Sequence, residues 1–169
     1  MRILKKIDSI LAKVLEAFCV ACMILLFLIM ILKVFFRFVP VLSMFPGFST
    51  GMFDEFTEWL FSWLILTCST LLCRNNAHFR VDLLSERLRG TRVGGILDAL
   101  CYLVALAFYV LLLYYSFKLC TGAVQTSPLL RWPKAVFYAC VPLNSFLMAI
   151  YTVVHIVRCI RCAIHPEKA

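Results

Sequence analysis

Four long apolar segments constrain the fold of this chain more than any other feature of its sequence. They cover residues 14–36, 56–73, 95–117 and 135–157, and each holds 18 to 23 residues. An α-helix rises about 1.5 Å per residue, so ~20 apolar residues cross the ~30 Å hydrocarbon core of a bilayer. The longest interval between two segments is 21 residues, which leaves no room for a separate soluble domain. The sequence therefore predicts an all-α integral membrane protein with four transmembrane helices.

The composition and the N-terminus agree with this class. Of the 169 residues, 63% are hydrophobic and 15% are charged, whereas soluble domains carry roughly 25% charged residues. The first apolar run follows a basic N-terminus, as in a secretory signal, but it exceeds the roughly 7–15 residues of a signal core. We therefore expect it to remain as the first span. The expected organisation is a lead-in over residues 1–13, a membrane domain over 14–164 and a tail over 165–169.

The distribution of basic residues predicts the orientation. Twelve of the 17 Lys and Arg residues fall on the side that holds both termini and the interval between the second and third spans. Because cytoplasmic segments of membrane proteins are enriched in Lys and Arg, both termini are expected in the cytoplasm. The formal net charge of +8 then faces anionic lipid headgroups. Nucleic acid is not an expected partner, since no soluble basic domain exists to bind it.

Two amphipathic segments are expected to lie on the cytoplasmic leaflet. In residues 1–13, Ile3, Ile7 and Ile10 recur at helical spacing among charged residues. Residues 77–89 place Val81, Leu84 and Leu88 at i, i+3 and i+7, which predicts a short helix on the membrane surface. The candidate residues of this interfacial helix are His78, Arg80, Val81, Asp82 and Arg87.

The start of the second span carries a cluster of acidic residues at the expected periplasmic end. Its members, with an adjacent indole, are Asp54, Glu55, Glu58 and Trp59. Arg37 and Lys33 end the preceding span at the same depth, so an architectural ion pair is the preferred interpretation. Contact with a partner protein is a second interpretation. A cation relay is a third, because acids inside membranes are functional candidates by default.

The interval between the third and fourth spans contains turn signals and interfacial side chains. Ser127, Pro128, Arg131 and Trp132 are the candidates here for contact with a partner. Pro142 lies within the fourth span and is expected to kink it, because proline lacks the backbone N–H that a helix requires.

Nine cysteines leave two interpretations open. Cys19 and Cys22 in the first span, with Cys159 and Cys162 at the end of the fourth, could form a four-thiolate zinc site near one membrane face. Buried thiolates in an apolar helix are costly, however, and cysteine packs well as a small hydrophobic residue. We therefore expect packing, with no metal and no other cofactor in this chain.

Four stretches, in order, resemble the small membrane subunit of tripartite ATP-independent periplasmic (TRAP) transporters. They are VFFRF at residues 34–38, DEFTEWLFSWL at 54–64, NAHFRVDLL at 76–84 and SPLLRWPKAVFYACVPLNSFLMA at 127–149. Each stretch alone is a weak signal, whereas the ordered set is fairly specific and covers nearly the whole chain.

The resemblance implies a non-catalytic scaffold in the inner membrane of a bacterium. Its partners would be a large elevator-type membrane subunit, a transiently docked periplasmic binding protein and membrane lipids. The large subunit would hold sodium and the organic acid, such as a C4-dicarboxylate or a sialic acid. The resemblance also implies that the small subunit braces the large one in the bilayer.

A four-helix membrane thiol oxidoreductase is the alternative from another class. Such an enzyme needs reactive cysteine pairs at the periplasmic face. The first periplasmic loop of this chain contains no cysteine and the second contains only Cys120, at its edge. The sequence therefore favours the transporter subunit.

Overall fold

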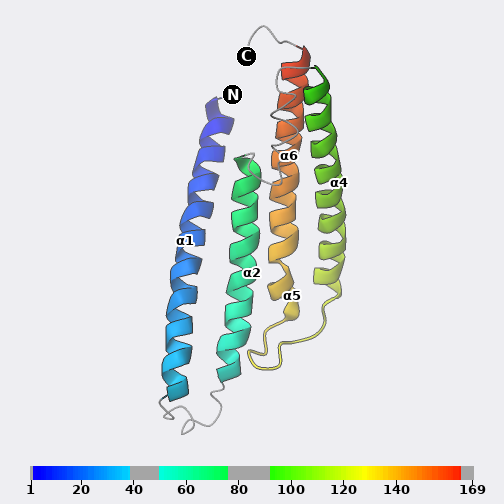
Figure 1. The fold of residues 1–169 in the computed structure, drawn as a ribbon. Helices are drawn as coiled ribbons and strands as arrows, with labels where there is room; N and C mark the ends of the chain where they lie inside the picture. The colour runs from blue at the N-terminus through cyan, green and yellow to red at the C-terminus, as the bar shows by residue number, and fades with distance from the viewer. Residues whose placement is uncertain (1, 39–49, 76–91, 165–169) are drawn as a thin grey trace.

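The computed structural model describes residues 2–38, 50–75 and 92–164, and this part of the chain is dominated by helices (Figure 1). The elements are α1 (Arg2–Phe38), α2 (Thr50–Arg74), α4 (Arg92–Gly122), α5 (Lys134–Tyr138) and α6 (Cys140–Ile164). In the described residues the only β-type pairing is an isolated bridge between Thr126 and Pro133. The interfacial helix expected over residues 77–89 lies outside the described residues.

Four stretches are long and apolar enough to cross a membrane, as the sequence predicts. They are Lys6–Phe36, Gly51–Arg74, Ala99–Gly122 and Lys134–Ile160. Each extends beyond at least one predicted boundary, because the helices continue into polar residues at their ends. The predicted fold class is confirmed: the chain is an all-α protein with four membrane-spanning helices.

The four long helices form a row rather than a closed bundle. The principal contacts join α1 to α2, α2 to α6, and α6 to α4 (Figure 1). The short α5 contacts α4 and α6. In the most apolar stretch of the fourth span, which comprises α5 and most of α6, 39% of the residues are buried. In the most apolar stretch of α4 only 11% are buried. The row therefore presents broad apolar surfaces that only lipid or a partner protein can cover.

The lead-in expected over residues 1–13 is not a separate element. Residues 2–13 form the first turns of α1, which continues unbroken to Phe38. No glycine or proline occurs between Arg2 and Phe38, so nothing interrupts the hydrogen-bond ladder. A helix of 37 residues is about 55 Å long, which exceeds the ~30 Å hydrocarbon core. α1 therefore extends beyond that core.

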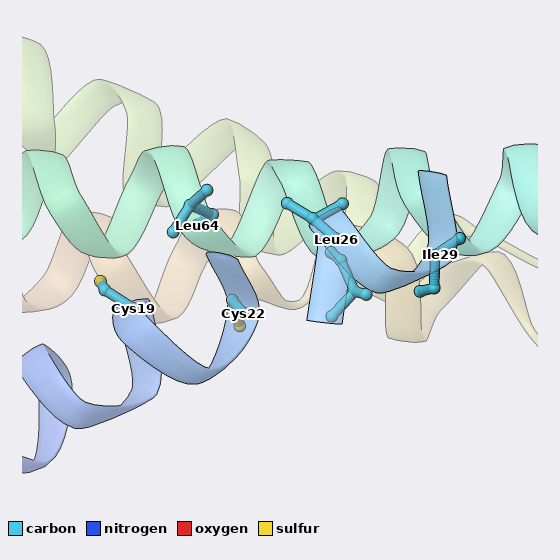
Figure 2. Packing of buried hydrophobic residues seen from close by; sticks show 6 residues of the cluster. Cys19, Cys22, Leu26, Ile29 and Leu64 are labelled. Carbon is cyan, nitrogen blue, oxygen red and sulfur yellow. The ribbon is translucent and has the colours of Figure 1, made fainter. Parts of the chain in front are cut away.

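One face of α1 forms a heptad stripe against α2. Its buried members Ala12, Cys19, Cys22, Leu26 and Ile29 are spaced by seven, three, four and three residues. Four of them pack with Leu60 and Leu64 of α2, and Figure 2 shows part of this contact. This spacing is typical of helices that pack at a shallow angle with side chains interlocked. The half-buried Leu15 fills the same register between Ala12 and Cys19, and the half-buried Asp8, Lys33 and Phe36 extend it toward the two ends of α1.

The contact between α2 and α6 is polar. Thr67, Thr70, Asn144 and Ser145 are each at most 1% exposed. The Thr70 hydroxyl lies 2.9 Å from the Asn144 side-chain oxygen, and the Asn144 amide donates to the Cys140 carbonyl at 2.9 Å. Small and polar residues allow close helix approach and bond across the interface in membranes. We call this contact the polar seam.

The fourth span is interrupted one turn before Pro142. α5 ends at Tyr138, Ala139 forms a turn, and α6 begins at Cys140. Pro142 has no N–H to donate to the Tyr138 carbonyl four residues earlier, so the helix cannot continue regularly through this turn. The expected kink is therefore an interruption at Ala139, near one end of the span.

We predict that Thr70→Val destabilises the protein by about 0.6 kcal/mol, the average for a hydrogen bond between membrane helices, and by no more than about 1.7 kcal/mol. Valine keeps the shape of threonine and removes the hydroxyl that reaches Asn144. Unfolding by sodium dodecyl sulfate in mixed micelles would measure the change. Thr70→Ser retains the hydroxyl and should remain close to wild type; equal losses in both variants would contradict a role for the hydrogen bond.

Candidate functional site

Two polar clusters lie at opposite ends of the row. The end at which α1 begins and α2 and α6 finish is called the terminal end (Figure 1). The opposite end contains the start of α2 and residues 123–133, which connect α4 to α5. The candidates in the described residues for an ion pair and for contact with a partner all lie at the opposite end.

Glu55 fastens the 123–133 connection to α2. Its carboxylate accepts a hydrogen bond from the Ser127 hydroxyl and a second from the Leu130 backbone N–H at 3.0 Å. Hydrogen bonds to a charged acceptor are stronger than neutral ones. Ser127 is only 5% exposed, so its hydroxyl is engaged within the chain.

The connection itself is a tight turn. The Ser127 N–H donates to the Trp132 carbonyl at 2.8 Å, and the Arg131 N–H donates to the Ser127 carbonyl at 3.1 Å. Arg131 has a φ of 55°, a left-handed conformation that few residues other than glycine adopt. The side chains of Pro128, Arg131 and Trp132 remain exposed. The turn therefore presents a ring, a guanidinium and an indole at the surface.

Trp59 connects this turn to the helices beneath it. Its ring lies edge-on to Trp132, with centroids 6.1 Å apart, and also contacts Phe56 and Phe137. Beside it is a cavity of about 350 Å³, lined among others by Glu58, Ser62, Lys134 and Tyr138. The indole N–H of Trp59 is buried and has no acceptor among the described residues.

The expected acidic cluster is divided between two sets of partners. Asp54 forms an ion pair with Lys33 of α1, as the preferred interpretation anticipated. Glu55 binds the 123–133 connection, which the sequence did not indicate. Glu58 is exposed at the mouth of the cavity. The side chain of Arg37 lies outside the described residues, so its expected pairing stays a prediction.

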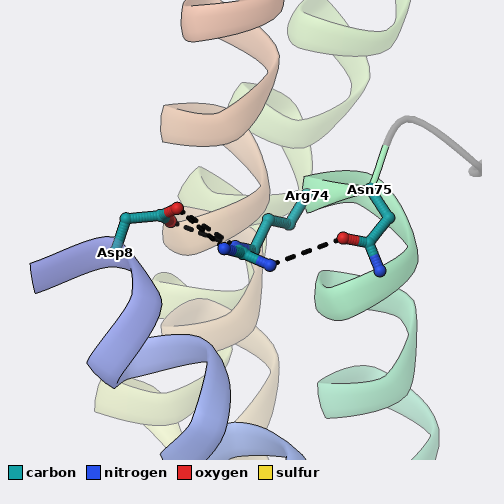
Figure 3. Close-up of polar contacts among 3 residues, drawn as sticks. All are labelled: Asp8, Arg74 and Asn75. Atoms are coloured by element: carbon teal, nitrogen blue, oxygen red, sulfur yellow. Dashed lines mark hydrogen bonds and ion pairs between the residues drawn. The ribbon is translucent and has the colours of Figure 1, made fainter. Parts of the chain in front are cut away.

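At the terminal end, Arg74 and Asp8 form an ion pair that the sequence analysis missed. The Arg74 guanidinium donates to both Asp8 carboxylate oxygens, at 2.9–3.2 Å, and also reaches Asn75 (Figure 3). The heptad register of α1 could have indicated this pair, because Asp8 and Lys33 are the two charged residues in the stripe that faces α2. Their partners Arg74 and Asp54 are 20 residues apart on α2, which corresponds to about 30 Å.

The polar seam continues toward the terminal end at α6. The His155 ring nitrogen Nε2 lies 3.1 Å from the Cys73 carbonyl, and the ring stacks on Tyr102 of α4. Cys73 in turn lies 3.6 Å from the Thr152 hydroxyl. These buried polar groups bond to one another, which indicates that they hold α2, α4 and α6 together.

The positions of Cys19 and Cys22 are those expected for cysteines that pack as small hydrophobic residues. Cys19 and Cys22 lie in the apolar contact between α1 and α2. Among the described residues, no group of three or more His, Cys, Asp or Glu side chains is placed to hold a metal ion. The side chain of Cys162 and the candidates of the interfacial helix, His78 to Arg87, lie outside that part.

These features define a multi-pass membrane protein whose buried polar groups join its own helices and whose broad surfaces are apolar. Residues 26–162 match the family model for tripartite ATP-independent periplasmic transporters, DctQ component. The chain belongs to this family of small membrane subunits, and the sequence-based resemblance is confirmed. A comparison with curated proteins returned no match.

We predict that Glu55→Ala loosens the 123–133 connection. Two hydrogen bonds to a charged acceptor are lost, so tryptic cleavage after Arg131 should accelerate. Mass spectrometry of digested proteoliposomes would follow the cleavage. Glu58→Ala removes an exposed carboxylate from the same helix and serves as the control; equal acceleration in both variants would refute the fastening role of Glu55.

We predict that Asp8→Arg destabilises the α1–α2 contact and that adding Arg74→Asp restores it. The pair is partly exposed, so its expected coupling energy is about 1 kcal/mol or less. Detergent unfolding of both single variants and the double variant measures this coupling. If the swap restores stability, the two charges interact directly and neither helix has been damaged. If the losses of the two single variants simply add, a direct charge interaction is excluded.

Proposed function

We propose that this TRAP small subunit is a non-catalytic scaffold in a sodium-coupled importer of an organic acid. It would brace the large membrane subunit in the bacterial inner membrane, while sodium and substrate bind to the large subunit. The transported acid would be a C4-dicarboxylate, a sialic acid or a related carboxylate. The assignment of the chain to the DctQ family supports this mechanism.

The observation that carries the scaffold role is the open row of helices. α1 and α4 occupy its two edges, and each has one long neighbouring helix with extensive contacts. Large side chains on the outer surface of α4, including Phe108, Leu111 and Tyr115, are more than half exposed. A partner can add its own helices along such a surface without disrupting the polar contacts inside the row.

The internal polar groups support a chain that does not transport by itself. Substrate sites of secondary transporters are typically built near the bilayer midplane from paired discontinuous helices. Here the buried Thr70, Asn144, Ser145 and Thr152 are bonded within the described chain. The described ion pairs lie at the helix ends. We therefore infer that sodium and the carboxylate bind elsewhere in the complex.

The turn at residues 127–132 is the proposed contact for the periplasmic binding protein. Arg131 and Trp132 are exposed there, and Glu55 and Trp59 hold the turn in place from beneath. This role requires the opposite end to face the periplasm and both termini to face the cytoplasm. The bias of Lys and Arg residues supports that orientation.

Affinity purification from native membranes tests the proposal. A tagged chain should recover a large multi-span membrane protein in comparable amount and, with substrate present, a periplasmic binding protein. Arg131→Glu should reduce recovery of the binding protein and leave that of the large subunit unchanged. Lys118→Glu makes the same charge change at an exposed position on α4 and is the matched control. Recovery of the chain alone would contradict the scaffold role.

A membrane thiol oxidoreductase remains the alternative and has less support. At the opposite end, the thiols of Cys120 and Cys140 donate to the carbonyls of Ala135 and Phe137 rather than to each other. Labelling of intact cells with an impermeant thiol reagent separates the two functions. An enzyme of this class would expose a reactive cysteine pair to the reagent after reduction.

A further inference from the structure

The contact between α1 and α2 brings two thiols from different helices together. The sulfur atoms of Cys19 and Cys68 lie 3.5 Å apart. Cys19 is 7% exposed, whereas Cys68 is partly buried at the edge of the same apolar cluster. Both are free thiols. Cys19 also precedes the residues 26–162 that match the family, so family membership does not account for the pair.

We propose that Cys19 and Cys68 form an oxidation site, at which a hydroperoxide converts the two thiols into an interhelical disulfide. Disulfide sulfurs are about 2.05 Å apart, so the two sulfurs must approach by roughly 1.5 Å. The two sulfurs start in contact, so the remaining approach is short. The bond would join positions 49 residues apart in the chain and tie α1 covalently to α2.

The chemistry proceeds in two displacements. The sulfur of Cys68, the more accessible thiol, attacks one peroxide oxygen and the O–O bond breaks. The departing hydroxide takes the thiol proton and leaves as water, and the sulfur becomes a sulfenic acid. The sulfur of Cys19 then attacks that sulfur, the S–O bond breaks, and the departing hydroxide takes the thiol proton to form a second water. Two thiols and one hydrogen peroxide therefore give one disulfide and two waters. The two sulfurs lose two electrons, and the peroxide gains them.

The contacts of other cysteines explain the choice of this pair. Cys73 lies beside the Met148 carbonyl and the Thr152 hydroxyl. Cys120 and Cys140 each donate to a backbone carbonyl. Each of these thiols lies against an oxygen atom. The thiol of Cys68 lies against a second sulfur, which can attack a sulfenic acid before that group is oxidised further.

Peptide mapping of the full chain in its native membrane tests the proposal. Trypsin releases residues 14–33, with Cys19 and Cys22, and residues 38–74, with Cys68 and Cys73. In the variant Cys22→Ala/Cys73→Ala each peptide keeps one cysteine. After treatment with hydrogen peroxide and alkylation with N-ethylmaleimide, mass spectrometry should find the two peptides joined. Dithiothreitol should abolish the joined species.

Single variants in the otherwise unchanged chain give an independent assignment. Cys19→Ala and Cys68→Ala should lose the joined peptides, whereas Cys22→Ala, one helical turn away from Cys19, should retain them. A link that persists in Cys19→Ala would assign the reaction to Cys22 and overturn the proposal. Failure to form the link while the exposed Cys101 is oxidised in the same sample would also overturn it.

Discussion

The packing of α1 along α2 depends on an apolar stripe with an ion pair at each end, and the helix that supplies the positive charge differs between the two pairs. At the terminal end α1 supplies the carboxylate of Asp8 and α2 the guanidinium of Arg74. At the opposite end α1 supplies the ammonium of Lys33 and α2 the carboxylate of Asp54. A shift of either helix along the other would separate these charges or bring like charges together. The apolar side chains between them provide cohesion, and the ion pairs at the helix ends select the register.

The remainder of the row follows a different principle. α2 packs on α6 through small polar residues, and α6 contacts α4 near the terminal end through His155 and Tyr102. In lipid, apolar side chains gain little by leaving one apolar surrounding for another, so close packing and hydrogen bonds contribute more. A chain that satisfies its polar groups in this way can leave its outer surfaces apolar, which is compatible with the proposed binding of a larger membrane partner.

The sequence predicted the fold class well and the site only partly. Hydropathy and helix length located all four spans, and the clustering of acids marked the opposite end. The pairing of Asp54 with Lys33 was anticipated from their similar depth. The binding of Glu55 to Ser127 and Leu130 was not, because these residues are 72 and 75 positions apart. The partner of Asp8 is not predicted from the sequence either, because the pattern of residues 1–13 favours a separate surface helix rather than an extension of α1 along α2.

By itself, the sequence determined the number of spans, their approximate limits and the family. These properties depend on local composition, on the thickness of a bilayer and on short motifs. Only the tertiary structure decided the order of the helices in the row, the continuity of α1 and the partner of each charged side chain. These depend on contacts between segments far apart in the chain, and every span is apolar enough to neighbour any other. The choice among neighbours is made by a few residues, such as Asn144 facing Thr70 and Arg74 facing Asp8, whose partners are identified only when the helices are assembled.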